Sequence, residues 1–412
     1  MMSTTTTFRE YRLKSGVRLD TAELAVLRSA FPSMDICGPI TDSSCYEVMP
    51  GHHIGVVQVS DRVFVVQPKV SIPRLGFALS YALDLVEWQD RVPYATAGSL
   101  ADLVAALFAD ALAGAVRRGL LQGYRSVEET AMTIRGRIRI DEQLRRRPGR
   151  LIPIEVGFDD FTEDIDANRV LRGALHRLSR LPLRHERTRR KLAVLQGPFV
   201  ETVSLVEYRR GEVPVVALSR LGAHYRPAVE LAKLILESTT PEVGGGDVDA
   251  AGFVVDMNKV FEAFVRSALR QALGLSRLAF PPPRGHMASL DRAKRVGLEP
   301  DLSWWEGGRC TFVGDAKYKA INVAGVKHAD LYQLLAYVAA LDLPGGLLVY
   351  AAGEVHEVVH EVELGATQRR LEVVTVDLDG APEKILRSIA TIANRVTALR
   401  RLACEIPSRP MW

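Results

Sequence analysis

The chain has 412 residues and is short of cysteine, of long apolar runs and of net charge. Its four cysteines, Cys37, Cys45, Cys310 and Cys404, form no CxxC pair, which argues against a cysteine zinc site and a disulfide framework. The longest apolar helix candidate, LVAALFADALAGAV, contains Asp110 and is too short to span a bilayer. The N-terminal sequence MMSTTTTFREYRLK has no apolar core of a signal peptide. We therefore expect a soluble, cytoplasmic protein with no membrane partner.

Two common kinds of binding site are also missing from the sequence. No GxxxxGK followed by Ser or Thr occurs anywhere, so we expect that this chain binds no nucleotide through a P-loop. The pair His52-His53 in PGHHIG has no third ligand at metal spacing, and we expect it to form a turn.

Positive charge is concentrated in two segments rather than spread along the chain. Lys and Arg exceed Asp and Glu by only 53 to 49, a net charge of +4 that does not prove a polyanionic partner. The segment 134–150, IRGRIRIDEQLRRRPGR, holds seven arginines, and RHERTRRK follows at 184–191. Arg135, Arg137 and Arg139 alternate on an expected strand, where they would contact phosphate, acidic groups of a partner, or only water.

The composition along the chain changes at a glycine-rich linker. The segment 241–252, PEVGGGDVDAAG, has three consecutive glycines and no large apolar side chain, which marks a domain boundary. We expect a strand-rich domain over 1–95, a mainly helical region over 96–243 and an α/β domain over 247–412. The fold class is thus α/β, with a mixed α+β N-terminal half and a C-terminal central mixed sheet flanked by helices.

Several elements inside these regions are predicted by local pattern. HIGVVQVSDRVFVVQPKV reads as a hairpin that turns at Ser60-Asp61, and a short helix is expected near 21–30. A long helix is expected from Ser99 to about Leu121.

The most informative stretch of the C-terminal domain is FVGDAKYKA, at 312–320. Asp315 and Lys317 are two residues apart on an expected strand, so their side chains leave the same face of the sheet. Pro300-Asp301 lies on the preceding strand, and a hairpin through WEGGRC would bring Asp301 to Asp315. Two neighbouring carboxylates need a cation, and Mg²⁺ is bound through one or two carboxylates together with substrate phosphate. Lys317 would orient the attacking water and stabilise charge on the phosphate, which is the chemistry of phosphodiester hydrolysis.

Three further residues extend this constellation. Glu262, on the helix that opens the domain, adds an acid toward the metal or its waters. Gln333 and Tyr337 are four residues apart on the helix that follows the strand and share one face. The alternatives are a solvated helix position for Glu262 and a core aromatic for Tyr337.

In this order of motifs the sequence resembles the PD-(D/E)xK nuclease fold as found in the McrC family, the cleavage subunit of McrBC-type modification-dependent restriction systems. The segments MNKVFEAFV at 257–265, PDL and GDAKYK are similar to the nuclease domain of that family. Upstream, IGVVQVSDRVFVVQPKVSIPRLGFALSYALDL, IRGRIRI and DFTEDIDANRVLRGAL are similar to its N-terminal half. The resemblance therefore covers most of the chain.

The resemblance implies a role for each matching residue. Asp301 and Asp315 would be metal ligands, Lys317 the catalytic lysine, and Glu262 a catalytic acid that reaches the metal through water. The backbone carbonyl of Ala316 would be a further ligand. The remaining DNA-binding or supporting residues would be Gln333, Tyr337 and Lys319. The cofactor would be Mg²⁺, with Mn²⁺ as a substitute.

The resemblance also implies partners and an activity. The chain would be an endonuclease that cuts double-stranded, modified DNA when a McrB-type AAA+ GTPase ring recruits it. Its N-terminal half, with a partner-docking domain over 1–95, would dock on the ring and stimulate GTP hydrolysis. Double-strand cutting would need two copies of the chain. Two alternatives stay open: an adaptor that activates an AAA+ motor and binds DNA without cutting, and a stand-alone repair or RNA-processing nuclease of the same fold.

Overall fold

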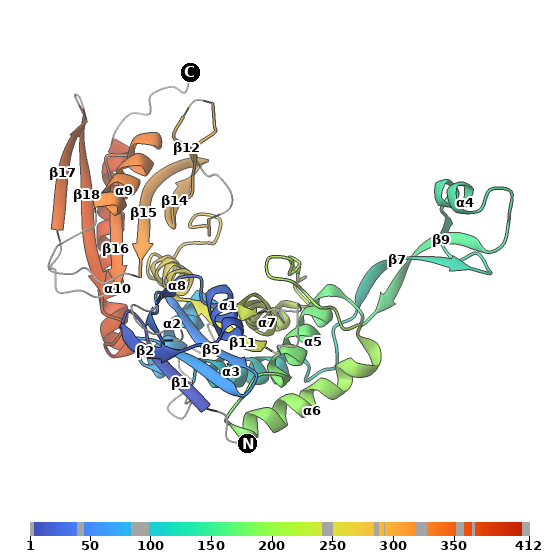
Figure 1. Ribbon diagram of the computed structural model, residues 1–412. Coiled ribbons are helices and arrows are strands. Elements are labelled where there is room, and N and C mark those ends of the chain that lie inside the picture. The colour runs from blue at the N-terminus through green and yellow to red at the C-terminus, as the bar shows by residue number, and fades with distance from the viewer. Residues whose placement is uncertain are drawn as a thin grey trace. The chain divides into compact units, whose positions relative to one another are not determined.

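The structure is a computed structural model that describes residues 4–38, 45–83, 99–240, 250–283, 288–291, 293–318, 328–351, 358–364 and 367–405 (Figure 1). The chain forms two compact units. The first comprises Met1–Val56, Asp61–Ser99 and Val254–Trp412, and the second Val57–Ser60 and Leu100–Phe253. The expected boundaries near 95 and 243 lie close to the points where the chain passes between units. Two domains can pack as one compact unit, so the three-part division stays a prediction.

The N-terminal part of the first unit is built from short strands and two helices. These are β1 (Thr4–Arg9), β2 (Lys14–Arg18), α1 (Thr21–Ala30), β3 (Asp35–Cys37), β4 (Cys45–Met49), β5 (His53–Val59), β6 (Arg62–Gln67) and α2 (Ile72–Ala82). Strand β6 lies between β1 and β5 and pairs in parallel with β1, while β2, β4 and β3 form a small antiparallel sheet.

Two local predictions in this part are confirmed. Helix α1 has the bounds that its pattern indicates, because Asp20 caps its first turn and Glu23 completes the capping box. Strands β5 and β6 flank the expected turn at Ser60-Asp61, where Ser60 has a positive φ of 50°. The sequence patterns of these elements are local, and they are satisfied by local hydrogen bonds.

The C-terminal part of the first unit carries a five-stranded mixed sheet. Its elements are α8 (Met257–Ala272), β12 (Ala288–Ser289), β13 (Gly297–Leu298), β14 (Leu302–Glu306), β15 (Arg309–Lys317), α9 (His328–Ala340), β16 (Gly345–Ala351), β17 (Val358–Leu364), β18 (Thr367–Val376) and α10 (Pro382–Glu405). The order of strands is β14-β15-β16-β18-β17. The two outer pairs are antiparallel and the two inner pairs parallel. The expected mixed sheet flanked by helices is confirmed.

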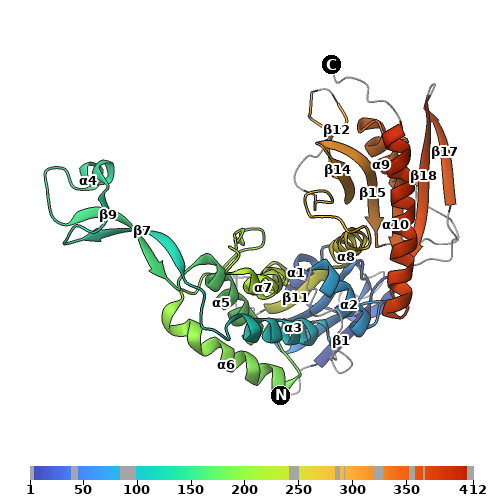
Figure 2. The same ribbon diagram turned by 180° about the vertical axis from the view of Figure 1, so that it is seen from behind.

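Helices α9 and α10 cover opposite faces of this sheet, and Figure 2 shows α10 in red along one of them. A Cβ on Gly346 would meet Leu334 and Val338 of α9, whereas one on Gly345 would meet Leu399 of α10. Successive residues of a strand point to opposite faces, so the two helices must lie on opposite sides. The α9 side holds a buried cluster that includes Val313 of β15.

The second unit combines a helical body with a small sheet. Its helices are α3 (Leu100–Ala115), α5 (Asp166–Ser179), α6 (Glu186–Thr202), the short η3 (Ala223–Tyr225) and α7 (Arg226–Ser238). Strand β10 (Thr239–Thr240) pairs with β11 (Ala250–Asp256), which continues into the first unit. Helix α3 is shorter than the expected helix, because the chain turns after Ala115. Among the described residues, no helix combines the length and the apolar character needed to cross a membrane.

The sheet of the second unit was not predicted as a whole. Strands β7 (Gly123–Ala131), β9 (Ile154–Thr162) and β8 (Arg137–Ile138) lie in the order β7-β9-β8, with the short helix α4 (Ile140–Arg146) beside them. We call residues 123–162 the arm; within this unit it extends away from α5 and α6 (Figure 1). The description of 96–243 as mainly helical is therefore incomplete. Of the three alternating arginines, only Arg137 lies on a strand.

A half-buried carboxylate, Asp164, ties the base of the arm to the helical body. Asp164 accepts hydrogen bonds from Arg125 Nη1 at 2.6 Å, from Arg169 Nε at 2.8 Å and from Ser204 N at 2.8 Å. The hydrogen bond from Arg169 holds the pKa of Asp164 well below its usual range, and it outweighs the opposite effect of burial.

We expect Asp164→Asn to lower the free energy of unfolding by about 2–3 kcal/mol at neutral pH, because it removes a charge-assisted network. A carboxyl whose pKa is depressed in the folded state stabilises the protein above its unfolded pKa of about 4. The difference between wild type and variant should therefore shrink as the pH falls below about 4. Thermal unfolding of wild type and variant between pH 7 and pH 3 measures this stability difference, with exposed Asp159→Asn as the matched control. An equal difference at all pH values would contradict this role.

Candidate active site

The side chains of Asp315 and Lys317 leave the same face of β15, as their spacing predicts. Their face is the one that α9 covers, because Val313 on the same alternation packs into the cluster under that helix. Lys317 Nζ forms an ion pair with Asp315 Oδ2. Asp315 is 1% exposed, and apart from the ammonium its Oδ2 has no hydrogen-bond partner within the part of the chain that the structure describes. A buried carboxylate oxygen of this kind is suited to a cation.

The hairpin between β14 and β15 brings Asp301 to the same place. Leu302 pairs with Gly314, so Asp301 lies beside Asp315 at the end of the two-stranded ladder. Asp301 Oδ2 accepts a hydrogen bond from Ala316 N at 3.0 Å. The N–H and C=O of one strand residue point to the same side, so the Ala316 carbonyl also faces Asp301. The structure thus brings together two carboxylates, one carbonyl and one ammonium.

Helix α8 contributes an acid and a base to this cluster. Glu262 is close enough to Asp301 and Lys317 for both charges to affect its pKa. Arg266, one turn further along α8, is close to Asp301 and Glu262, and burial lowers its pKa against the effect of these two acids. Sequence reasoning missed Arg266, although its spacing of four residues from Glu262 places it on the same helix face.

Two acids of the cluster, Asp315 and Glu262, resist ionisation. Burial raises the pKa of Asp315 to about 8; the neighbouring Asp301 adds to the shift and Lys317 reduces it. Burial likewise raises the pKa of Glu262 to about 7, again with a contribution from Asp301. Burial alone would lower the pKa of Lys317, but Asp315 and Asp301 together raise it. Such repulsion among buried acids is relieved when a cation binds between them.

Gln333 and Tyr337 do share one face of α9 and bond to each other. Gln333 Nε2 donates to Tyr337 Oη at 2.7 Å, and Tyr337 Oη donates to the carbonyl of Glu299 at 3.3 Å. Burial and the charge of Asp315 raise the pKa of Tyr337, so the phenol stays protonated near the cluster. The pair therefore supports the loop before Asp301. Lys319, the remaining predicted residue, lies outside the described residues.

A buried polar cluster holds the end of the strand that carries Lys317. Tyr318 Oη donates to Glu10 Oε2 at 3.2 Å, and Lys69 Nζ donates to the carbonyl of Tyr318 at 3.1 Å. Lys69 Nζ also lies 4.1 Å from the centre of the Tyr318 ring. These contacts join residues more than 240 positions apart in the sequence, and no local pattern signals them.

Comparison with known protein families identifies the family of the chain. A family model described as "McrBC 5-methylcytosine restriction system component" matches residues 48–351, which include Glu262, Asp301, Asp315 and Lys317. The chain belongs to the McrBC family. The resemblance to McrC read from the sequence is thereby confirmed. No curated protein matches the chain.

Two solved structures are similar to this McrBC family member, and both come from Thermococcus gammatolerans. One is a half-complex from a tetradecameric assembly of McrB AAA+ hexamers with bound McrC; the similarity has a TM-score of 0.53 at 21% identity and covers 95% of this chain and 100% of that one. At 21% identity this similarity is evidence for a shared fold only. The other is a McrBC complex with a TM-score of 0.40 and 23% identity, covering 66% of this chain and 89% of that one.

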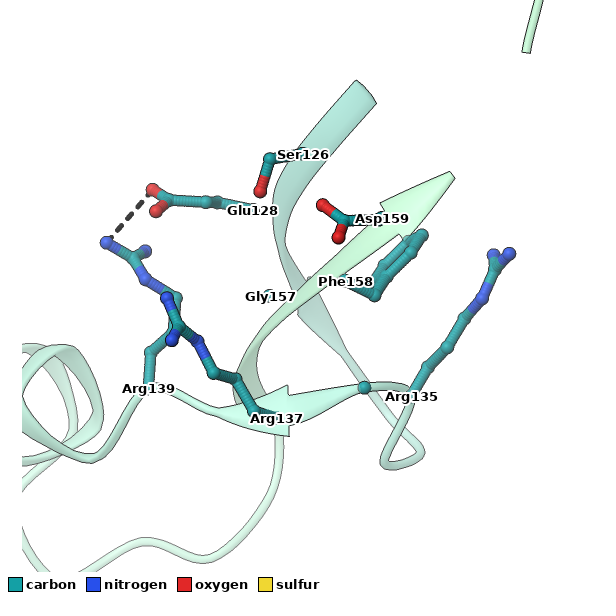
Figure 3. A pocket seen from close by; sticks show the side chains of 9 residues that line it. Ser126, Glu128, Arg135, Arg137, Arg139, Gly157, Phe158 and Asp159 are labelled. Carbon is teal, nitrogen blue, oxygen red and sulfur yellow. Dashed lines mark ion pairs between the residues drawn. The ribbon is translucent and has the colours of Figure 1, made fainter. Parts of the chain in front are cut away.

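The McrBC family chain also has a hollow on its arm, shown in Figure 3. It has a volume of about 660 Å³ and is lined by Ser126, Glu128, Arg135, Gly136, Arg137, Arg139, Gly157, Phe158 and Asp159. Arg139 pairs with Glu128 at 2.9 Å, and Arg135 pairs with Asp160 at 3.0 Å. Arg137 makes no ion pair with any described residue. Ion pairs within the arm thus neutralise much of the positive charge that the sequence concentrates there.

Proposed function

We propose that the chain is the Mg²⁺-dependent DNA endonuclease subunit of a McrBC-like restriction complex, with a C-terminal domain of the PD-(D/E)xK fold. The observation that carries this proposal is the meeting of Asp301, Asp315 and Lys317 at one end of the β14–β15 hairpin. The mixed sheet between α9 and α10 and the membership of the McrBC family support it.

The donor set fits Mg²⁺, with Mn²⁺ as a substitute. Asp301, Asp315 and the Ala316 carbonyl would hold the ion, and Glu262 would reach it through water, because Mg²⁺ takes oxygen ligands and keeps several waters. Asp315 is buried, and among the described residues its Oδ2 contacts only the Lys317 ammonium, which supports this assignment. When bound, the ion supplies Lewis acidity and lowers the pKa of water.

The side chains of the chain then act on the DNA phosphate. The Lys317 ammonium, paired with Asp315, donates to the scissile phosphate and orients the attacking water. Arg266 adds positive charge beside Glu262, where it balances the acids and attracts the phosphate backbone. Tyr337 and Gln333 hold the loop that carries Asp301. Glu10 and Lys69 hold the end of β15 at Tyr318.

We further propose that a McrB-like AAA+ GTPase ring recruits the chain to double-stranded, modified DNA. The similar structure from Thermococcus gammatolerans, described as McrB AAA+ hexamers with bound McrC, supports this choice of partner. Cutting both strands would need two copies of the chain, since the described residues of one copy hold one such cluster. The complex would act in the cytoplasm.

The arm offers the surface for this partner. Among the described residues it is a small three-stranded sheet flanked only by the short helix α4, and a sheet of this size needs a buried hydrophobic face to be stable in water. Large apolar side chains are nevertheless exposed along it, with Leu151 at 87% and Tyr124 at 78%. Exposed apolar side chains gathered in one element are typical of a protein interface.

We expect Leu151→Asp to weaken binding to the ring about 10- to 100-fold, because burying a leucine contributes about 1.5–3 kcal/mol. The Tm should stay unchanged, since the side chain is exposed in the free chain. Leu278→Asp, 88% exposed in the first unit, is the matched control and should bind normally. The affinity of each variant for the ring is measured by pull-down with increasing concentrations of the tagged GTPase. Equal binding by both variants would remove the arm from the interface.

The proposed function is tested by cleavage of modified and unmodified plasmid DNA with Mg²⁺, with and without the GTPase and GTP. We expect cutting of modified DNA only in the complete mixture. Cutting by the chain alone would point to an autonomous nuclease. Stimulation of GTP hydrolysis without any cutting would point to an adaptor.

A further inference from the structure

His52 and His53 meet a third potential metal ligand that is remote in the sequence. His52 lies at a bend directly before β5, so the two neighbouring imidazoles lie on one side with ring centres 4.6 Å apart. Asp256, at the N-terminus of α8, joins them, with Oδ1 at 3.8 Å from His52 Nε2. One donor atom of each residue lies within 4.8 Å of the others. No third ligand lies at metal spacing in the sequence, and the structure instead supplies one from about 200 positions further along.

The backbone around the three residues is held in place. Met257 N donates to the carbonyl of His52 at 3.0 Å, which fastens the start of α8 to the strand. Asp256 Oδ1 accepts from Asn258 N at 2.9 Å and caps the helix. Gly51 allows the loop to approach Ser33 closely, since a Cβ there would lie 2.4 Å from the Ser33 carbonyl. The cluster is thus built from fixed elements and not from free side chains.

Ser33 hydrogen-bonds to one ring nitrogen of His53, as a supporting group usually does for a metal-ligating histidine. His53 Nδ1 lies 2.8 Å from Ser33 Oγ, and this hydroxyl also accepts from the backbone N–H of His53 at 3.1 Å. When Nδ1 donates to the hydroxyl, Nε2 carries the lone pair that binds a metal. A hydrogen bond on the other ring nitrogen fixes both tautomer and orientation in metal sites.

The cluster is reachable from solvent on one side. His53 is buried, while the side chains of His52 and Asp256 are 29% and 16% exposed. Two imidazoles, one carboxylate and an open position make the ligand set of a tetrahedral site completed by water. Imidazole favours first-row transition ions, whereas Mg²⁺ favours oxygen ligands.

We propose that His52, His53 and Asp256 form a site for a divalent transition-metal ion, Zn²⁺ in the first place, separate from the carboxylate cluster at Asp301 and Asp315. The ion would bridge the start of β5 and the start of α8, the helix that carries Glu262 and Arg266. Its occupancy would therefore set the position of α8.

The test measures Zn²⁺ binding by competition with a chromophoric chelator, and the visible spectrum after loading with Co²⁺. Both are done in an Asp315→Asn background so that the other cluster does not take the ion. The variants are His52→Ala and Asp256→Asn; asparagine keeps the cap of α8 because it caps helices as well as aspartate. His224→Ala, an exposed histidine of the second unit, is the control.

We expect one Zn²⁺ per chain with a submicromolar dissociation constant and a tetrahedral Co²⁺ spectrum. Each site variant should weaken binding at least about 100-fold and lose that spectrum, because a lost ligand costs more than the 10- to 100-fold effect of a supporting residue. His224→Ala should bind as the parent does. Equal Zn²⁺ affinity in all variants, or no binding below about 100 µM in the parent, would overturn the proposal. The Tm without metal verifies that each variant is folded.

Discussion

Asp315→Asn is expected to reduce DNA cleavage by the complete McrBC-like mixture by about 10³-fold or more, since a bound metal supplies several kcal/mol of transition-state stabilisation. Asparagine has the same shape but no charge, so the donor set beside Asp301 loses its central carboxylate. Binding of Mn²⁺, measured by calorimetry, should weaken in parallel. The initial rate of plasmid linearisation measures the cleavage.

The same substitution should leave the chain folded and bound to its GTPase. Burial and the neighbouring Asp301 raise the pKa of Asp315 to about 8, so the charge itself is unfavourable in the metal-free protein. We expect an unchanged or slightly higher Tm. Asp35→Asn, an exposed aspartate of the same unit, is the matched control and should cut at the normal rate. Normal cutting by Asp315→Asn would place the nuclease site elsewhere.

Lys317→Met is expected to lower the cleavage rate by about 10²- to 10³-fold, the usual effect of losing one donor to the transition state. Methionine keeps the length and apolar stem of the side chain, which is only 18% exposed, but removes the ammonium. Because no metal ligand is lost, Mn²⁺ binding should be as tight as in wild type or tighter. Single-turnover cleavage and calorimetry of the same preparation separate these two effects.

Comparing the two variants distinguishes a ligand from a group that acts on the phosphate. Asp315→Asn should lose both metal binding and cleavage, whereas Lys317→Met should lose cleavage alone. Lys384→Met, which removes a lysine from an exposed ion pair with Asp377, is the matched control. Loss of Mn²⁺ binding in Lys317→Met would mean that the lysine only organises the carboxylates.

The spacing of residues along single strands and helices determined the central part of the candidate site. Alternation along a strand is a property of the backbone itself, so Asp315 and Lys317 had to share a face once β15 formed. The glycines at 307 and 308, both with positive φ, permit the tight turn that places Asp301 beside them. The spacing of four residues likewise placed Gln333 and Tyr337 on one face of α9.

Local pattern failed in the arm, and the failure has a physical cause. A strand is recognised when one face is buried and the other is solvated, because apolar and polar residues then alternate. No residue of β7 is buried, and one face is only half-buried, so its sequence GYRSVEETA carries no alternation of apolar and polar residues. Pairing with β9 stabilises it instead, and such pairing is not encoded within either segment.

What the sequence by itself determined is therefore the set of candidate residues, the acids and the lysine, and their order along the chain. Only the tertiary structure decided which distant groups join them. Arg266 and Glu262 reach Asp301 through the packing of α8, Glu10 reaches Tyr318, and Asp256 reaches His52. Periodicity acts over a few residues, whereas contacts between remote segments depend on the path of the whole chain and on the burial that makes this path stable.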